Sequence, residues 1–324
     1  MTEKENALRI IQFNKPERVL CGAPTFSLSY RGCNLEGFDG LGDWNLPIGA
    51  KWYDIWGTGW QKEQEGVIGL TFHCPLAEVG ALQDYVWPDP NDERIIGKIY
   101  EQFEEYQKSD KSDFLSGSHR STLFERAYML VGMENLMVYF YEEPEFVKEL
   151  LGRIMDFQMG IAKHYAKLGI EFAGLGDDLG TQRGLLFSPA IMDEFFVPEY
   201  RRIFDFYKER NVLRSFHSCG CVIDAADTLA DLGVTILNPV QDTANDLPML
   251  LQKIDGRMAL QGGIPSDLIM NGPTEAIAAE VQRKIALLGK NGGYFCDADQ
   301  GLPFPEAHVT ALREAVSLYG RYPV

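Results

Sequence analysis

The stretch VLRSFHSCGCVIDAADTLADLGVTILNPV, residues 212–240, predicts a strand, a helix and a second strand in succession. Residues 212–218 and 234–240 are short apolar runs of the length that buried strands have. The segment 222–232 between them has helical spacing, and it stops at Gly233 as helices often stop at glycine. Two strands joined by a helix run parallel, so this stretch is one unit of a parallel α/β sheet.

The same unit recurs through the second half of the chain. Further strands are predicted at 171–177, 258–264 and 292–298, and helices at 188–211, 248–254, from Pro273 onward and at 305–319. Ser188 is a good N-cap for the first of these helices, and Pro198 is expected to kink it. Five strand-then-helix units imply a parallel sheet, and their apolar runs indicate that helices cover both faces or surround a barrel.

A closed barrel is favoured over an open doubly wound sheet, because no glycine-rich phosphate fingerprint follows an early strand. We therefore expect one (β/α)₈ barrel domain over residues 1–324. The segments 15–26 and 112–119 are expected to supply early strands. Residues 43–61, dense in Trp and Gly, are predicted to form loops over the barrel mouth. If that stretch is helical, Trp52, Trp56 and Trp60 form one apolar stripe, which is more typical of a core.

Composition limits the classes of partner. The formal net charge is −17, which disfavours nucleic acid and anionic membranes because those surfaces require clustered Lys and Arg. No apolar run approaches the ~18 residues that span a bilayer, and the first residues show no signal sequence. The six cysteines are scattered, so we expect reduced thiols and a cytoplasmic protein.

His217 and Cys219 are the strongest candidates for chemistry. Residues i and i+2 of an extended chain point the same way, and both lie where a barrel carries its active site, at the C-terminal end of a strand. Imidazole and thiolate suit Zn²⁺, which usually takes three protein ligands at a catalytic site. Cys296 is the preferred third ligand, and Asp178, Asp297 and Cys221 are alternatives. Asp177 and Asp178 point oppositely on a strand, and we favour Asp178 as the residue that enters the site.

Several longer motifs resemble those of a known superfamily. They are GDDLGTQRGLLFSP (176–189), FHSCG (216–220), LGVTILNPVQ (232–241), LQGGI (260–264) and YGRYP (319–323), with weaker matches at DIWGTGW (54–60) and around Glu125. Together they resemble the uroporphyrinogen decarboxylase superfamily, and within it the corrinoid-dependent zinc methyltransferases, which include O-demethylase components and methylcobalamin:coenzyme M methyltransferases.

The resemblance implies a barrel and a zinc ion held by a His-x-Cys pair and a later Cys. His217 and Cys219 match that pair, whereas Gln300 falls where the later Cys is expected and Cys296 lies slightly earlier. Decarboxylases that act on uroporphyrinogen carry an arginine-rich N-terminal segment for its carboxylates. Residues 23–34 have Arg31 alone, so that substrate is not expected.

The function implied is methyl transfer between a small methylated substrate, preferably an aryl methyl ether, and the corrinoid of a partner protein. The chain has no Asp-x-His-x-x-Gly segment with which to bind a corrinoid itself. Asp178 and His217 are the expected catalytic residues. Substrate contacts are expected from Asp177, Gln182, Gln241 and Trp60. The alternatives are a methylcobalamin:thiol methyltransferase, a metal-independent lyase anchored by Asp178, and a binding or scaffold protein.

Overall fold

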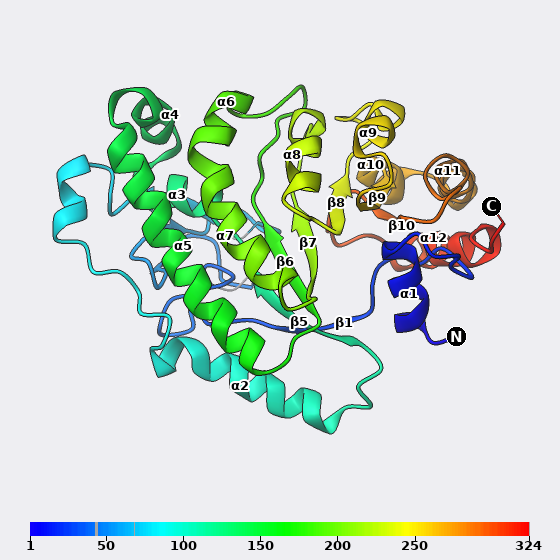
Figure 1. Ribbon diagram of the computed structural model, residues 1–324, viewed down its shortest axis with the longest axis horizontal. Helices are drawn as coiled ribbons and strands as arrows, with labels where there is room; N and C mark the ends of the chain where they lie inside the picture. The colour runs from blue at the N-terminus through cyan, green and yellow to red at the C-terminus, as the bar shows by residue number, and fades with distance from the viewer. Residues whose placement is uncertain (43–44, 68, 324) are drawn as a thin grey trace.

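A parallel sheet of seven strands forms the centre of the molecule (Figure 1). The computed structural model describes residues 1–42, 45–67 and 69–323. Hydrogen bonds join the strands in the order β1-β5-β6-β7-β8-β9-β10, and all neighbours are parallel. The strands are β1 (Thr25–Leu28), β5 (Phe114–His119), β6 (Phe172–Gly176), β7 (Leu213–His217), β8 (Ile236–Val240), β9 (Ala259–Ile264) and β10 (Tyr294–Ala298).

The two edges of this sheet meet through one segment of chain. Strand β1 pairs with β5, and Leu20, a few residues earlier, forms a parallel bridge with Phe295 of β10. The sheet therefore curls into a barrel, as expected from the sequence. Among the described residues seven strands make up its ladder, where eight were expected.

Helices surround the sheet, and Figure 1 shows α5 and α7 along one side and α11 and α12 along another. The five strand-then-helix units predicted for the second half are confirmed. The helices are α2 (Glu93–Lys108), α3 (Phe124–Val131), α4 (Met133–Glu142), α5 (Pro144–Lys167), α6 (Pro189–Ile191), α7 (Val197–Lys208), α8 (Ala226–Asp231), α9 (Leu247–Ile254), α10 (Ser266–Asn271), α11 (Thr274–Leu288) and α12 (Glu306–Tyr319).

The predicted irregularity at Pro198 takes the form of a widened turn. Ser188 caps the helix start by accepting a hydrogen bond from the Ile191 N–H, and a π-helical turn over Met192–Phe196 separates α6 from α7. Pro198 has no N–H to donate to the carbonyl of residue 194, which removes one α-helical hydrogen bond at this point.

Helix α1 (Glu3–Ile11) closes the N-terminal end of the barrel. Its side chains Ala7, Ile10 and Ile11 are buried in one cluster with residues from the beginnings of the strands. Those residues are Leu20, Phe114, Phe172, Ile236, Ala259 and Phe295. With this end filled by apolar side chains, the opposite end is the one left for a site.

The Trp-rich segment forms an antiparallel sheet where loops were expected. Its strands are β2 (Lys51–Tyr53), β3 (Gly59–Gln61) and β4 (Leu70–His73). Trp52 pairs with Trp60 across two strands with ring centroids 6.4 Å apart, so the three tryptophans form no helical stripe. Residues 43 and 44, the first of the predicted loop, lie outside the described residues.

A buried ion pair ties this small sheet to α3. Asp54 accepts hydrogen bonds from the backbone N–H groups of Trp56 and Thr58, from the indole of Trp60, and from Arg126 at 2.8 Å. The side chains of Asp54 and Arg126 are essentially unexposed.

Within the part of the chain that is described, no helix has the length and apolar character needed to cross a membrane.

Candidate metal centre

Three side chains with metal-binding atoms meet at the C-terminal ends of β6 and β7. His217 is the last residue of β7, Cys219 follows two residues later, and Asp178 lies two residues beyond the end of β6. Their donor atoms all lie within 4.8 Å of one another. The His217 Nε2 atom is 3.5 Å from the Cys219 sulfur and 3.4 Å from the Asp178 Oδ1 atom.

These distances fit a zinc ion. With bonds of ~2.0 Å to nitrogen, ~2.1 Å to oxygen and ~2.3 Å to sulfur, a tetrahedral ion separates N from O by about 3.4 Å and N from S by about 3.5 Å. Nitrogen, thiolate and carboxylate are also ligand types that zinc accepts. The three residues could therefore hold a metal ion of the size of zinc, with one position open to a further ligand.

The backbone of the two loops is fixed by close packing. Gly220 has φ +82°, and a Cβ atom there would lie 2.4 Å from the backbone of Gly180, so this contact requires glycine. The Cys219 N–H donates to Asp178 Oδ1 at 3.0 Å, and the hydroxyl of Ser218 accepts from the Leu179 N–H at 3.0 Å. The loop that carries Asp178 is thereby fixed against the loop that carries Cys219.

Asn238 of β8 sets the orientation of the His217 ring. Its amide nitrogen lies 2.6 Å from the Ser215 hydroxyl and 3.4 Å from the Phe216 carbonyl, which only accepts, so its carbonyl oxygen faces His217 Nδ1 at 3.2 Å. Nδ1 must then carry the proton, because the amide oxygen only accepts. The lone pair of Nε2 is left to face Cys219 and Asp178, as a metal ligand requires.

Without a cation, hydrogen bonds hold the group together. Burial alone would lower the pKa of His217, but its bonds to Asp178 and Cys219 raise that pKa to about 10. Burial opposes ionisation of Asp178, yet its bonds with His217 and the Cys219 N–H bring its pKa below the usual value. A cluster that stabilises opposite charges so strongly is one in which a cation can replace the imidazolium proton.

Cys296 does not join this group, which corrects our choice of third ligand. Successive side chains of a strand alternate between the two faces. Asp297 of β10 lines the cavity beside His217, so Cys296 points the other way and is fully buried in the main hydrophobic core. Burial raises its pKa to about 12. Asp178, the alternative, is the residue that the structure places with His217 and Cys219.

Asp177, which was expected to contact substrate, points into the protein interior. Its carboxylate is fully buried and accepts hydrogen bonds from the N–H groups of Leu123 and Glu125 and from the Tyr200 hydroxyl. Leu123 and Glu125 flank the first residue of α3, so Asp177 supports the start of that helix. Burial and the nearby Glu125 carboxyl raise the pKa of Asp177.

The other expected substrate contacts have different positions. Trp60 is 4% exposed and its indole is bonded to Asp54, so packing within the small sheet accounts for it. Gln182 is exposed in the turn after Gly180. Gln241 is buried, and its carbonyl oxygen accepts the Gly220 N–H, which places it behind the Cys219 loop as a positioning group.

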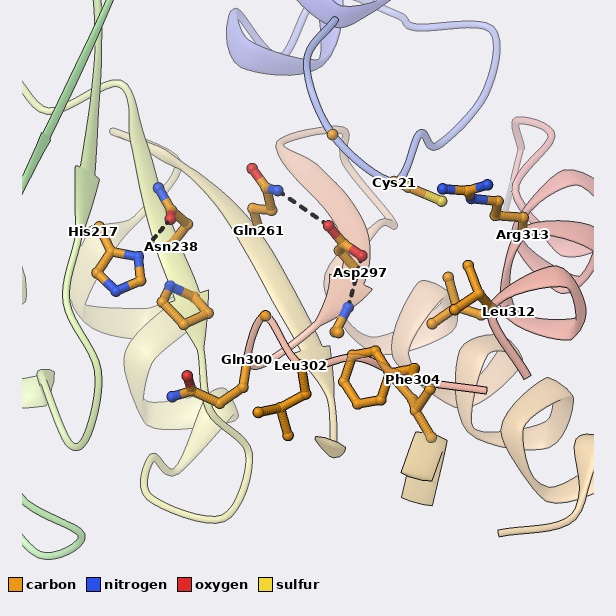
Figure 2. Close-up of a pocket in the computed structure, with 16 residues that line it drawn as sticks. Cys21, His217, Asn238, Gln261, Asp297, Gln300, Leu302, Phe304, Leu312 and Arg313 are labelled. Carbon is orange, nitrogen blue, oxygen red and sulfur yellow. Dashed lines mark hydrogen bonds between the residues drawn. The ribbon is translucent and has the colours of Figure 1, made fainter. Parts of the chain in front are cut away.

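A cavity of about 460 Å³ opens beside His217, a volume suited to a small molecule. Figure 2 shows polar side chains from four neighbouring strands along it, namely His217, Asn238, Gln261 and Asp297. Apolar side chains and one arginine complete the wall; they include Ile269, Leu302, Phe304, Leu312 and Arg313. One polar side of the cavity and one apolar side would suit a ring that bears a polar substituent.

Sequence reasoning missed most of this wall. Asn238, Gln261 and Asp297 each stand two residues after an inward-facing residue, which is Ile236, Ala259 or Phe295. Asp297 was expected only as an alternative metal ligand, and a search for polar residues at the last inward position of each strand would also have found Asn238 and Gln261. Glu125, at the start of α3, lies near the group as well. Burial and the Asp178 carboxylate raise its pKa.

One solved structure among the comparisons supports this fold. No curated protein sequence matches the chain. The solved structure of a methyltransferase from Methanosarcina mazei aligns with 98% of this chain and 99% of its own, with 15% identity and a TM-score of 0.71. A B12-independent methionine synthase from Shewanella sp. W3-18-1 aligns over 67% of this chain and 64% of its own, with 11% identity and a TM-score of 0.40.

The sequence itself matches a family model. The model described as uroporphyrinogen decarboxylase (URO-D) covers residues 81–319, which include both loops of the metal group and all the strands from β5 to β10. The barrel and its parallel strands are consistent with that match. The chain therefore belongs to the uroporphyrinogen decarboxylase family.

Proposed function

We propose that this protein is a zinc-dependent methyltransferase that moves a methyl group from a small methylated substrate, an aryl methyl ether, to the corrinoid of a partner protein. The observation that carries the proposal is the three-residue donor group with zinc-like spacing, which borders a cavity of small-molecule size. The family match and the likeness to a methyltransferase structure support it.

Each residue of the site has a role in this proposal. Asp178, His217 and Cys219 would hold the zinc, which when bound would act as a Lewis acid on the ether oxygen and make the phenolate a better leaving group. Asn238 keeps the Nε2 lone pair of His217 available, and Gln241 fixes the Cys219 loop. The apolar wall formed by residues such as Phe304 and Leu312 would hold the ring and exclude water from it.

A separate protein is proposed to bring the corrinoid to the barrel mouth. The N-terminal end of the barrel is filled by α1, so an acceptor can reach the donor group from the strand-end side. We expect the exchange to take place in the cytoplasm, as the scattered free cysteines suggest.

The proposal is tested by a methyl-transfer assay with free reduced cobalamin as surrogate acceptor and a panel of methoxybenzenes as donors. The zinc-loaded protein is expected to form methylcobalamin, and the absorbance of methylcobalamin measures the rate. Methyl transfer should be lost when the zinc is removed by a chelator, and also in the variants His217→Ala and Cys219→Ser. The variant Cys296→Ala should retain it. Turnover that survives chelation would instead favour the metal-independent lyase, and methyl transfer from methylcobalamin to a thiol alone would favour the thiol methyltransferase.

A further inference from the structure

The loop after β10 brings a glutamine side chain against the sulfur of the metal group. The Nε2 atom of Gln300 lies 3.1 Å from the Cys219 sulfur. Figure 2 shows Gln300 at the end of the cavity where His217 lies. This contact joins two elements that are 81 residues apart in the chain, so it depends on the barrel fold and not on local sequence.

The neighbouring residue fixes the backbone from which Gln300 reaches. Asp299 is 3% exposed, and its carboxylate accepts hydrogen bonds from the Ser266 N–H at 2.9 Å and from the Ser266 hydroxyl. The Asp299 N–H donates to the Ile264 carbonyl at 2.9 Å. Position 300 is thereby anchored to the end of β9, while its side chain makes no other hydrogen bond with a described residue.

The direction of the amide follows from hydrogen-bond chemistry. An amide nitrogen can donate to a thiolate, whereas an amide oxygen at 3.1 Å would place two electron-rich atoms in contact. A hydrogen bond from N–H withdraws electron density from the sulfur. A metal ion bound to that sulfur then receives less charge from it and polarises its remaining ligand more strongly.

We propose that Gln300 is a positioning residue that sets the donor strength of the Cys219 thiolate toward the bound cation. The inference rests on the proposed metal site but adds a residue outside the three ligands. Because the glutamine amide is neutral, it supplies this hydrogen bond without adding charge to the site or competing as a strong ligand.

The test uses the full-length protein loaded with Co²⁺, whose absorption band from sulfur-to-metal electron transfer reports on the thiolate. Gln300→Met keeps a side chain of similar length and removes the N–H donor. Without that hydrogen bond, the sulfur lone-pair electrons are held less tightly and less energy is needed to transfer one of them to the metal. The absorption band is therefore expected to move to longer wavelength. Gln261→Met is the matched control, because Gln261 lines the same cavity and is bonded to Asp297 at 3.4 Å. Its band is expected to match that of the unmodified protein.

Cys219→Ser should abolish the band and so assign it. An identical band in Gln300→Met and in the unmodified protein would overturn the inference and leave the metal site intact. An equal shift in Gln261→Met would also overturn it, because the effect would then belong to cavity polarity in general. If the unmodified protein binds Co²⁺ without any sulfur band, the metal site itself fails, and the inference with it.

Discussion

His217 and Asn238 form a pair in which the amide oxygen lies 3.2 Å from the imidazole Nδ1 atom. The amide nitrogen also lies 3.4 Å from the Phe216 carbonyl oxygen, which only accepts, so the orientation of the asparagine is determined on its far side. This arrangement decides which ring nitrogen carries the proton, and therefore which one is free to bind a cation. A metal ligand supported in this way depends on its neighbour as well as on its own side chain.

Replacement of Asn238 should weaken metal binding without removing a ligand. Asn238→Leu frees the His217 ring to rotate or change tautomer, and we expect zinc affinity to fall roughly 10- to 100-fold. The measurement is a competition titration with a zinc chelator. Asn271→Leu, on the exposed end of α10, is the control and should bind zinc normally. Unchanged affinity in Asn238→Leu would show that the ring is held by something else.

The neighbours Asp177 and Asp178 should respond to mutation in opposite ways. Asp177→Ala leaves the buried N–H groups of Leu123 and Glu125 without an acceptor, so the free energy of unfolding should fall by about 3 kcal/mol. Asp178→Ala should bind zinc poorly, and with both proteins metal-free its free energy of unfolding should lie within about 1 kcal/mol of that of the parent, since the carboxylate is partly exposed. Urea titration and a zinc assay of both variants check this, and the reverse pattern would contradict the site.

His119 should make stability depend on pH. It is fully buried between Gln158 and Tyr207, and burial lowers its pKa from 6.5 to about 4. The unfolded chain then binds a proton that the folded protein does not, so stability is complete above pH 6.5 and is lost as the pH falls toward 4. The loss attributable to this residue is at most about 3 kcal/mol.

Urea titrations between pH 4 and pH 8 on the parent and on His119→Asn isolate that contribution. The difference between the two proteins should change across this window, because only the parent carries the buried imidazole. The pKa of Asp177 is raised in the folded protein, so its contribution to stability changes with pH in the opposite direction. Both proteins contain Asp177, and this contribution therefore cancels in the difference. A difference that stays constant with pH would mean that the pKa of His119 is the same in the folded and the unfolded chain.

Much of the fold could be predicted because its information is local. The apolar runs and helix boundaries in the second half each lie within one segment, and parallel strands bring their ends to one rim. His217 and Cys219 belong to a single strand end, so their shared direction followed from spacing alone. The Trp-rich segment was harder, since the pairing of Trp52 with Trp60 depends on a turn and on Asp54 contacts with α3.

The third member of the donor group could not be assigned with the same ease. Cys296 has the right chemistry, but its neighbour Asp297 takes the inward face of β10, and a shift of one residue reverses the direction of a strand side chain. Asp178 reaches His217 because the glycine contact between residues 180 and 220 brings the two loops together. That contact joins segments 40 residues apart in the chain, and no local sequence pattern predicts it.

The most direct test is the metal content of the purified protein and three variants, measured by elemental analysis. The unmodified protein and Cys296→Ala are expected to hold about one zinc per chain, because Cys296 faces the core. His217→Ala and Cys219→Ser should hold little or none. Zinc-free parent protein under zinc-replete expression, or loss of zinc in Cys296→Ala with retention in Cys219→Ser, would contradict the assignment of Asp178, His217 and Cys219 as a metal centre.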